Sequence, residues 1–385
     1  MEREGPGRLP SLTGLRAAAA GVVLLSHLRY LVPDDVLFTV GPAHVDAWGV
    51  MRQGNAGVSL FFLLSGFVLT WSMRSDDRPS RFWGRRGARI LPLHVTVWVV
   101  WIVLAALGAL AAVRWGPALA TLVLVQAWIP DPAYHFGAVN PPTWSLSVEV
   151  FFYALFPAIA LVLPRLGRAA LLRLAAACTV VALAIPVACW RLLTTSAEYW
   201  SYVFPISRLP EFVLGSALAA WLGRAVEDPG GAEPWLRRLG VRWTAAFAAL
   251  AYLVAGRLPR VLANTTATLV PFLLVLLAAA VADLEPRRSF WRHPVVLHLG
   301  RVSYAVFLVQ YLVLDVLLRT VGEATTVPGG VALVGLGIAL TLAVAEVAHA
   351  LVERPAERRL RSGRARSRGD RGPADRDRAR ARGTP

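Results

Sequence analysis

The sequence predicts an all-α polytopic membrane protein with about ten transmembrane helices and both termini in the cytoplasm. Composition supports this class, because 56% of the 385 residues are hydrophobic and 17% are charged, whereas about a quarter of an ordinary soluble domain is charged. The apolar residues form blocks of roughly 17–23 residues, the length that crosses about 30 Å of hydrocarbon. The clearest blocks are residues 91–113, 174–190, 261–281, 302–318 and 331–352.

Ten helices are expected along the chain, at about 14–31, 56–73, 90–112, 145–163, 174–190, 203–223, 243–257, 261–283, 302–319 and 329–352. We expect the first to be a retained helix, because no small-residue cleavage site follows it. Residues 119–128 are apolar but too short to span, so they predict a short re-entrant or interfacial segment in an outer loop. A tight outer turn around residues 256–260 separates the seventh helix from the eighth.

Arginine supplies the basic character of the chain, since its 40 Lys and Arg residues include no lysine. With the helices placed, the Arg-rich stretches 74–89, 164–173, 235–242 and 285–294 share one side, which the positive-inside rule makes cytoplasmic. A net charge of +16 could indicate nucleic-acid binding, but here it is a topology signal, and no nucleic-acid partner is expected. Residues 356–385 have no apolar pattern and predict a disordered Arg-rich cytoplasmic tail that contacts anionic lipid.

Two ionisable residues stand in the first helix, where a lipid-facing charge would cost a few kcal/mol or more. Arg16 and His27 are eleven residues apart, so they share a helical face about 16 Å apart. Arg16 then lies at the cytoplasmic interface and His27 near the middle of the bilayer. An ordinary structural interpretation is a snorkelling Arg and a His that hydrogen-bonds a neighbouring helix. Since intramembrane ionisable groups usually mark function, His27 is a candidate general base.

A carboxylate is expected at a similar depth. Residues 140–157 enter from the outer side after a Pro-Pro turn, which places Glu149 within about one or two helical turns of the level of His27. A buried His and a carboxylate can act as a general base and its orienting partner. A structural hydrogen bond between two helices would explain the same residues, and both interpretations stay open.

Three arginines precede the third predicted helix. Arg85 and Arg89 share a helical face, and Arg86 is their neighbour. Guanidinium groups bind phosphates well, although the positive-inside rule alone would place arginines here. Together with Arg16 they predict a phosphate-binding cytoplasmic mouth below His27, suited to a phosphorylated donor that feeds a reaction inside the membrane.

The other intramembrane charges have structural explanations. Arg208 and Glu211, at i and i+3 within one span, are expected to form an ion pair that fixes helix packing, with a functional role as the alternative. Glu353, at the cytoplasmic end of the last helix, either orders an arginine of the mouth or pairs with the tail. The seven His residues show no close ligand spacing, so no metal site is expected.

Motifs along residues 9–355 resemble the acyltransferase 3 family of integral membrane acyltransferases. The first helix carries Arg16 and His27 at the spacing of that family, the second carries its Ser-Gly-Phe signature, and RRGARILPLH resembles its Arg-x-x-Arg motif. Later segments that resemble the family are NPPTWSLSVEVFFYALFP, RLPEFVLGSALA, LGRVSYAVFLVQ and LVERPAERRL. We therefore expect one transmembrane acyltransferase domain over residues 1–355, followed by the tail.

The resemblance implies transfer of an acyl group, often acetyl, from cytoplasmic acyl-CoA to a hydroxyl, with no permanently bound cofactor. His27 would remove the hydroxyl proton and Glu149 would orient it or share the proton, with a transient acyl-histidine as the alternative route. The residues expected to hold the phosphates of acyl-CoA are Arg16, Arg85, Arg86 and Arg89. The residues expected to support the site are Ser65, Trp144, Ser145, Tyr153, Arg208, Glu211, Tyr304 and Glu353.

The acceptor is a separate question. The segments LPSLTGLR and LVQAWIPD resemble the antibiotic-tailoring branch, which favours a sugar or macrolide hydroxyl over a cell-envelope polysaccharide or lipid-linked glycan. Many relatives carry His where this chain has Gln310, which can hydrogen-bond but cannot titrate, so Gln310 is left out of the catalytic set. A proton-coupled transporter is the alternative from another class, although the sequence shows no inverted repeat.

Overall fold

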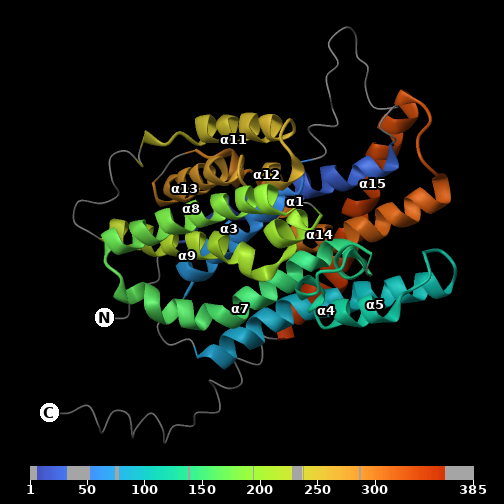
Figure 1. Ribbon diagram of the computed structural model, residues 1–385, viewed down its shortest axis with the longest axis horizontal. Coiled ribbons are helices and arrows are strands. Elements are labelled where there is room, and N and C mark those ends of the chain that lie inside the picture. The colour runs from blue at the N-terminus through green and yellow to red at the C-terminus, as the bar shows by residue number, and fades with distance from the viewer. Residues whose placement is uncertain are drawn as a thin grey trace, which may run out of the picture.

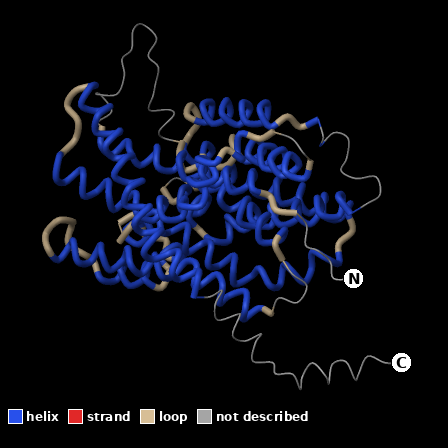
Figure 2. The backbone as a smooth tube through the Cα atoms, turned by 180° about the vertical axis from the view of Figure 1, so that it is seen from behind, coloured by secondary structure: helices blue, strands red, loops and turns tan. Residues whose placement is uncertain are grey.

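The computed structural model describes residues 7–32, 53–73, 78–137, 139–193, 195–227, 236, 238–285 and 288–359. Within these residues every regular element is a helix and none is a strand (Figure 2), which confirms the all-α class. Most of the first predicted outer loop and residues 360–385 of the predicted tail lie outside the described residues. The last helical segment, Val327–Arg359, continues past the domain boundary predicted at residue 355.

Ten helices of the described chain coincide with the ten predicted segments. Seven belong to segments long and apolar enough to cross a membrane: α1 (Pro10–Leu28), α4 (Pro79–Ala106), α7 (Trp144–Val162), α8 (Arg168–Leu192), α9 (Pro205–Glu227), α14 (Pro294–Val321) and α15 (Val327–Ala348). Three are shorter and apolar: α3 (Ala56–Trp71), α11 (Val241–Ala255) and α13 (Leu269–Leu284). The protein is therefore a multi-pass membrane protein, while the number of crossings and the side of the termini stay predictions.

Several predicted helix boundaries differ from the structure, and two of them have a local reason. The third helix, predicted from residue 90, begins at Pro79, since a proline suits the first helical position. Its arginines therefore stand on a helix and not in a loop. The eighth helix, predicted over 261–283, is interrupted between α12 (Arg260–Ala263) and α13 by a turn in which Asn264 and Thr265 are buried.

Glycines bring two pairs of helices into backbone contact at the centre of the molecule. A Cβ on Gly66 of α3 would lie 2.0 Å from the carbonyl oxygen of Phe212 in α9, and a Cβ on Gly215 of α9 would lie 2.1 Å from the backbone of α3. A Cβ on Gly300 of α14 would lie 1.9 Å from the carbonyl oxygen of Thr13 in α1. Small residues permit such close crossings between membrane helices, so these two pairs form the centre of the bundle.

The bundle has two outer groups of helices around this centre. Figure 1 shows α11 and α13 along one edge and α4, α7 and α5 (Trp115–Leu122) along the opposite edge, with α1, α3 and α9 between them. α1 and α14 run parallel, because Thr13 lies beside Gly300 and His27 lies beside Tyr311 further along both helices. Successive residues along α1 thus meet successive residues of α14 in the same order.

The segment predicted to be re-entrant or interfacial packs against the bundle. The predicted residues 119–128 fall in α5 and η2 (Gln126–Trp128), and the chain continues through α6 (Pro132–His135) and η3 (Pro141–Thr143). His94 Nε2 of α4 hydrogen-bonds the carbonyl oxygen of Thr121 at 3.1 Å, and Asn140 Nδ2 donates to the carbonyl oxygen of Leu308 at 2.8 Å. Because Leu308 is near the midpoint of α14, the chain that leads into α7 starts at mid-height of the bundle and not at its outer rim.

Candidate active site

A cavity between α1, α3, α4, α7 and α14 brings most of the predicted site residues together. Its empty space, including the mouth, is about 870 Å³. The polar side chains that line it are Arg16, Ser65, Arg86, Arg89, Ser145, Glu149, Tyr153, Ser303 and Tyr304. Apolar side chains that include Val58, Phe61 and Phe307 complete the wall.

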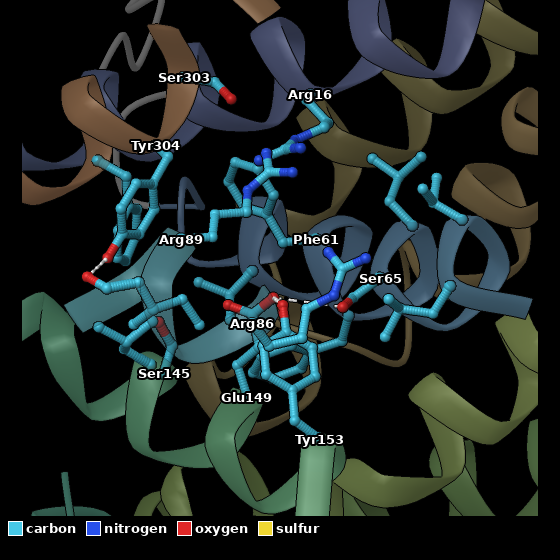
Figure 3. A pocket seen from close by; sticks show the side chains of 18 residues that line it. Arg16, Phe61, Ser65, Arg86, Arg89, Ser145, Glu149, Tyr153, Ser303 and Tyr304 are labelled. Carbon is cyan, nitrogen blue, oxygen red and sulfur yellow. Dashed lines mark hydrogen bonds between the residues drawn. The ribbon is translucent and has the colours of Figure 1, made fainter. Parts of the chain in front are cut away.

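Three arginines point into this cavity (Figure 3). Arg16 comes from α1, and Arg86 and Arg89 come from the N-terminal half of α4. The Arg86 guanidinium lies over the rings of Phe82 and Tyr153, 5.7 and 5.9 Å from their centroids, and its Nε is buried without a hydrogen-bond partner among the described residues. The Nε–H of Arg86 therefore has no partner among the described residues and is a candidate donor to an anion.

Glu149 is the only carboxylate in the described lining. Its Oε1 accepts a hydrogen bond from Ser65 Oγ at 3.2 Å and a second from the Tyr153 hydroxyl, one turn further along α7 (Figure 3). Its charge also acts on Arg16 and Arg86. One carboxylate among three guanidinium groups leaves the cavity positively charged, which favours a polyanionic ligand.

Arg85, predicted to act with the other arginines, does not line the cavity. It precedes Arg86 directly, and successive helical residues point in directions about 100° apart. The structure therefore assembles three of the four arginines predicted to bind phosphate.

His27 lies beyond the cavity, further along α1. It is about 16 Å from Arg16 along the helix axis. Its ring packs edge-on against Tyr311, 5.6 Å between centroids, and lies parallel to the ring of Tyr30 at 6.4 Å. Its Nδ1 is buried and has no hydrogen-bond partner in the part of the chain that the structure describes.

The structure places Glu149 beside the arginines of the cavity and not beside His27. The predicted pairing of Glu149 with His27 is therefore wrong. The prediction placed the start of α7 at the outer surface. The hydrogen bond from Asn140 to the midpoint of α14 instead draws that start into the bundle, which moves Glu149 toward the arginine end.

The predicted supporting residues divide between the cavity and its frame. The Tyr304 hydroxyl donates to the carbonyl oxygen of Ile90 at 2.8 Å and ties α14 to α4 (Figure 3). Ser145 lines the cavity and donates to the carbonyl oxygen of Pro142 at 3.1 Å. Trp144 lies outside the lining, where its ring packs against another aromatic ring.

Glu353 is buried at the end of the last helix, in the short π-helical turn His349–Glu353. Its Oε2 lies 2.7 Å from Nδ1 of His349, and its charge acts on Arg16. Of the two predicted interpretations, this geometry favours the one in which Glu353 orders an arginine of the cavity.

Comparison with known proteins decides the family. A family model that describes an acyltransferase domain, acyltransferase 3, matches residues 9–346. The chain belongs to the acyltransferase 3 family. This acyltransferase is 32% identical to Acyltransferase MdmB of Streptomyces mycarofaciens over 375 residues, 92% of each chain.

Other relatives match a shorter part of this acyltransferase. It is 29% identical over 170 residues to Peptidoglycan O-acetyltransferase OatA of Listeria monocytogenes, which is 40% of this chain and 24% of that protein. It is 28% identical over 168 residues to O-acetyltransferase OatA of Staphylococcus aureus, 40% of this chain and 25% of that protein. No solved structure matches the chain. The resemblance found in the sequence motifs is confirmed, and the protein is a membrane O-acyltransferase.

The predicted ion pair of this acyltransferase is present, outside the lining of the cavity. Arg208 Nη2 lies 2.9 Å from Glu211 Oε2, and both side chains are 1% exposed. Arg208 also donates to Thr265 Oγ1 at 2.6 Å and to Ser59 Oγ at 2.8 Å, and its guanidinium lies over the ring of Tyr202. These contacts join α9 to α3 and to the turn before α13, which is a structural role.

Sequence reasoning missed several residues of the site. Ser303, Phe61 and Phe307 line the cavity, but uncharged residues inside apolar runs carry no local signal. Outside the cavity, the role of Asp283 near the end of α13 was also not predicted, because its partner is far away in the sequence. Its carboxylate accepts hydrogen bonds from the backbone N–H and the hydroxyl of Ser11 at 2.6 and 2.7 Å, and these bonds anchor the start of α1. Among the described residues no group of three His, Cys, Asp or Glu is arranged to hold a metal ion.

Proposed function

We propose that this acyltransferase takes an acyl group, acetyl in the simplest case, from cytoplasmic acyl-CoA and transfers it to a hydroxyl of a sugar or macrolide. The observation that carries the donor is the convergence of Arg16, Arg86 and Arg89 on one cavity. Guanidinium groups bind phosphates through paired charge-assisted hydrogen bonds, and the nucleotide end of CoA carries several phosphates. The surplus of positive charge in the lining supports a ligand of this kind.

The separation of the arginines from His27 suits an extended donor. With the phosphates at the Arg16 end, the pantetheine arm runs along α1 and α14 toward His27, about 16 Å further on. The arm has a similar length. The thioester is then delivered beside the candidate general base, and the N-terminal end of α1 faces the cytoplasm where acyl-CoA is found.

His27 is the proposed general base, and the acceptor hydroxyl attacks the thioester directly. Nδ1 of His27 makes no hydrogen bond within the described residues, so this ring nitrogen is not used to hold helices together. Glu149, held by Ser65 and Tyr153, is proposed to position the arginines and no longer to orient His27. A transient acyl-histidine remains the alternative route.

The acceptor hydroxyl is proposed to belong to a sugar or macrolide. The LPSLTGLR and LVQAWIPD segments resemble the antibiotic-tailoring branch, and this resemblance supports a small-molecule acceptor. A cell-envelope glycan is the second candidate, because relatives that match 40% of the chain are named as O-acetyltransferases, one of them for peptidoglycan.

The test measures acetyl-CoA binding by titration calorimetry and CoA release by mass spectrometry with detergent-purified protein. Arg86→Ala is expected to weaken acetyl-CoA binding about tenfold or more, because one or two charge-assisted hydrogen bonds are lost. His27→Ala is expected to keep binding and lose turnover. Acetyl-pantetheine, which lacks the nucleotide phosphates, should bind wild type and Arg86→Ala equally.

Two results would overturn the proposal. Absence of both binding and CoA release in folded wild-type protein would exclude acyl-CoA as the donor and point to a different acyl donor. Full turnover by His27→Ala would exclude His27 as the base.

A further inference from the structure

Beyond the cavity, further along α1 and α14, two polar side chains face each other without a hydrogen bond of regular geometry. Gln310 of α14 is fully buried and lies against His27 of α1. Neither Nε2 nor Oε1 of Gln310 has a hydrogen-bond partner among the described residues, and Nδ1 of His27 has none either. The interaction between the two side chains is therefore a hydrogen bond of poor geometry, and the rest of the hydrogen-bonding capacity of the Gln310 amide is unused among the described residues.

This arrangement is costly for stability alone. A buried amide whose hydrogen bonds are incompletely made destabilises the fold, whereas an apolar side chain of similar size would avoid that cost. Buried side chains that destabilise the fold are expected mainly at functional sites. The position of Gln310 therefore indicates a partner that arrives with the substrate.

Gln310 stands beside the cavity. It follows Phe307, which lines the cavity, by one helical turn of α14, and the Phe307 ring packs against Phe61 at 6.1 Å between centroids. On its other side the next residue, Tyr311, packs against Tyr30, which is 43% exposed. Gln310 is thus placed between the arginine-lined cavity and a partly exposed aromatic pair.

We propose that Gln310 is a further catalytic residue, whose side-chain NH₂ binds the carbonyl oxygen of the acyl thioester beside His27. The proposal rests on the proposed donor. His27 takes the proton of the acceptor hydroxyl as the hydroxyl oxygen bonds to the carbonyl carbon, and the displaced electron pair moves onto the carbonyl oxygen at Nε2 of Gln310. When the pair returns, the C–S bond breaks, and the departing thiolate takes the proton from His27.

A glutamine amide suits this position chemically. Its Nε2 donates to the developing negative charge, while its Oε1 can accept an N–H from His27 and orient the ring. A neutral donor stabilises the oxyanion without placing a positive charge beside the base. Loss of one such donor typically lowers kcat by about a hundred- to a thousandfold.

The decisive variant is Gln310→Met, which keeps the volume and removes both polar atoms. We expect kcat for CoA release to fall about a hundredfold, the KM for acetyl-CoA to stay within about twofold, and the melting temperature to stay equal or rise. Thr341→Val is the matched control, because Thr341 of α15 is also fully buried with an unpartnered hydroxyl and lies outside the cavity. This control is expected to keep kcat.

The contrary outcomes are distinct. Normal kcat in Gln310→Met, while the wild type releases CoA, overturns the role of Gln310 and leaves the proposed function standing. A marked fall in melting temperature, or failure to fold, also overturns it, since the amide would then have a structural partner. Failure of the wild type itself to bind and cleave acetyl-CoA overturns the proposed function instead.

Discussion

At the scale of single residues, neighbours in the sequence differ sharply in their place in the site. Arg86 lines the cavity, and Arg85 does not. We therefore expect Arg86→Ala to raise the KM for acetyl-CoA about tenfold or more, since a charge-assisted hydrogen bond contributes about 1.5–3 kcal/mol, and Arg85→Ala to raise it far less. Steady-state CoA release measures both. Equal effects would show that phosphates are held by general surface charge.

The negative charge of Glu149 is predicted to offset the mutual repulsion of the three arginines in the cavity. Glu149→Gln removes the only lining carboxylate of the described residues, so mutual repulsion should lower the melting temperature by several degrees. Added CoA should restore most of that loss, because its phosphates replace the missing charge. Thermal unfolding with and without CoA tests this, and a variant as stable as wild type without CoA would contradict it.

At the scale of elements, the buried ion pair joins α9 to its neighbours. Glu211→Leu alone leaves Arg208 charged and buried, which typically costs about 3–5 kcal/mol. The double variant Arg208→Met with Glu211→Leu should recover most of that stability, because no unpaired charge remains. Melting temperatures of the three proteins decide the matter. A double variant no more stable than Glu211→Leu would contradict this role of the pair.

The crossing of α3 and α9 depends on Gly66. An added Cβ would meet the backbone of Phe212, so Gly66→Ala should lower both melting temperature and turnover, because the adjacent Ser65 donates to Glu149. Gly21→Ala in α1 is the control, since its Cβ would meet no atom within 4 Å and alanine favours the helix by roughly 0.5–1 kcal/mol. Equal tolerance of both substitutions would refute the close packing.

At the scale of the whole molecule, the arginine distribution predicts the orientation in the membrane. In a background with Cys178 and Cys189 changed to alanine, Glu323→Cys in the exposed loop between α14 and α15 should react with an impermeant maleimide on intact cells. Arg8→Cys, exposed before α1, should react only after the membrane is permeabilised. Labelling of both sites on intact cells would show that the proposed topology is wrong.

The sequence by itself determined the class, the helices and most of the charged lining. Long apolar runs define membrane helices locally, because the bilayer demands length and hydrophobicity within one segment. An ionisable residue inside such a run is equally visible, which is why Arg16 and Glu149 could be predicted from the sequence. Arg86 and Arg89 were predicted differently, from the arginine cluster that precedes the third predicted helix. The family motifs lie within the same runs.

Only the tertiary structure decided which of these residues meet. The depth of α7 depends on a hydrogen bond between Asn140 and Leu308, 168 residues apart, so Glu149 joined the arginines and not His27. The unpartnered amide of Gln310 became visible only when α1 and α14 lay side by side. Local sequence patterns indicate which segments are buried in the membrane. Which side chains of different helices contact each other depends on the packing of residues far apart in the chain.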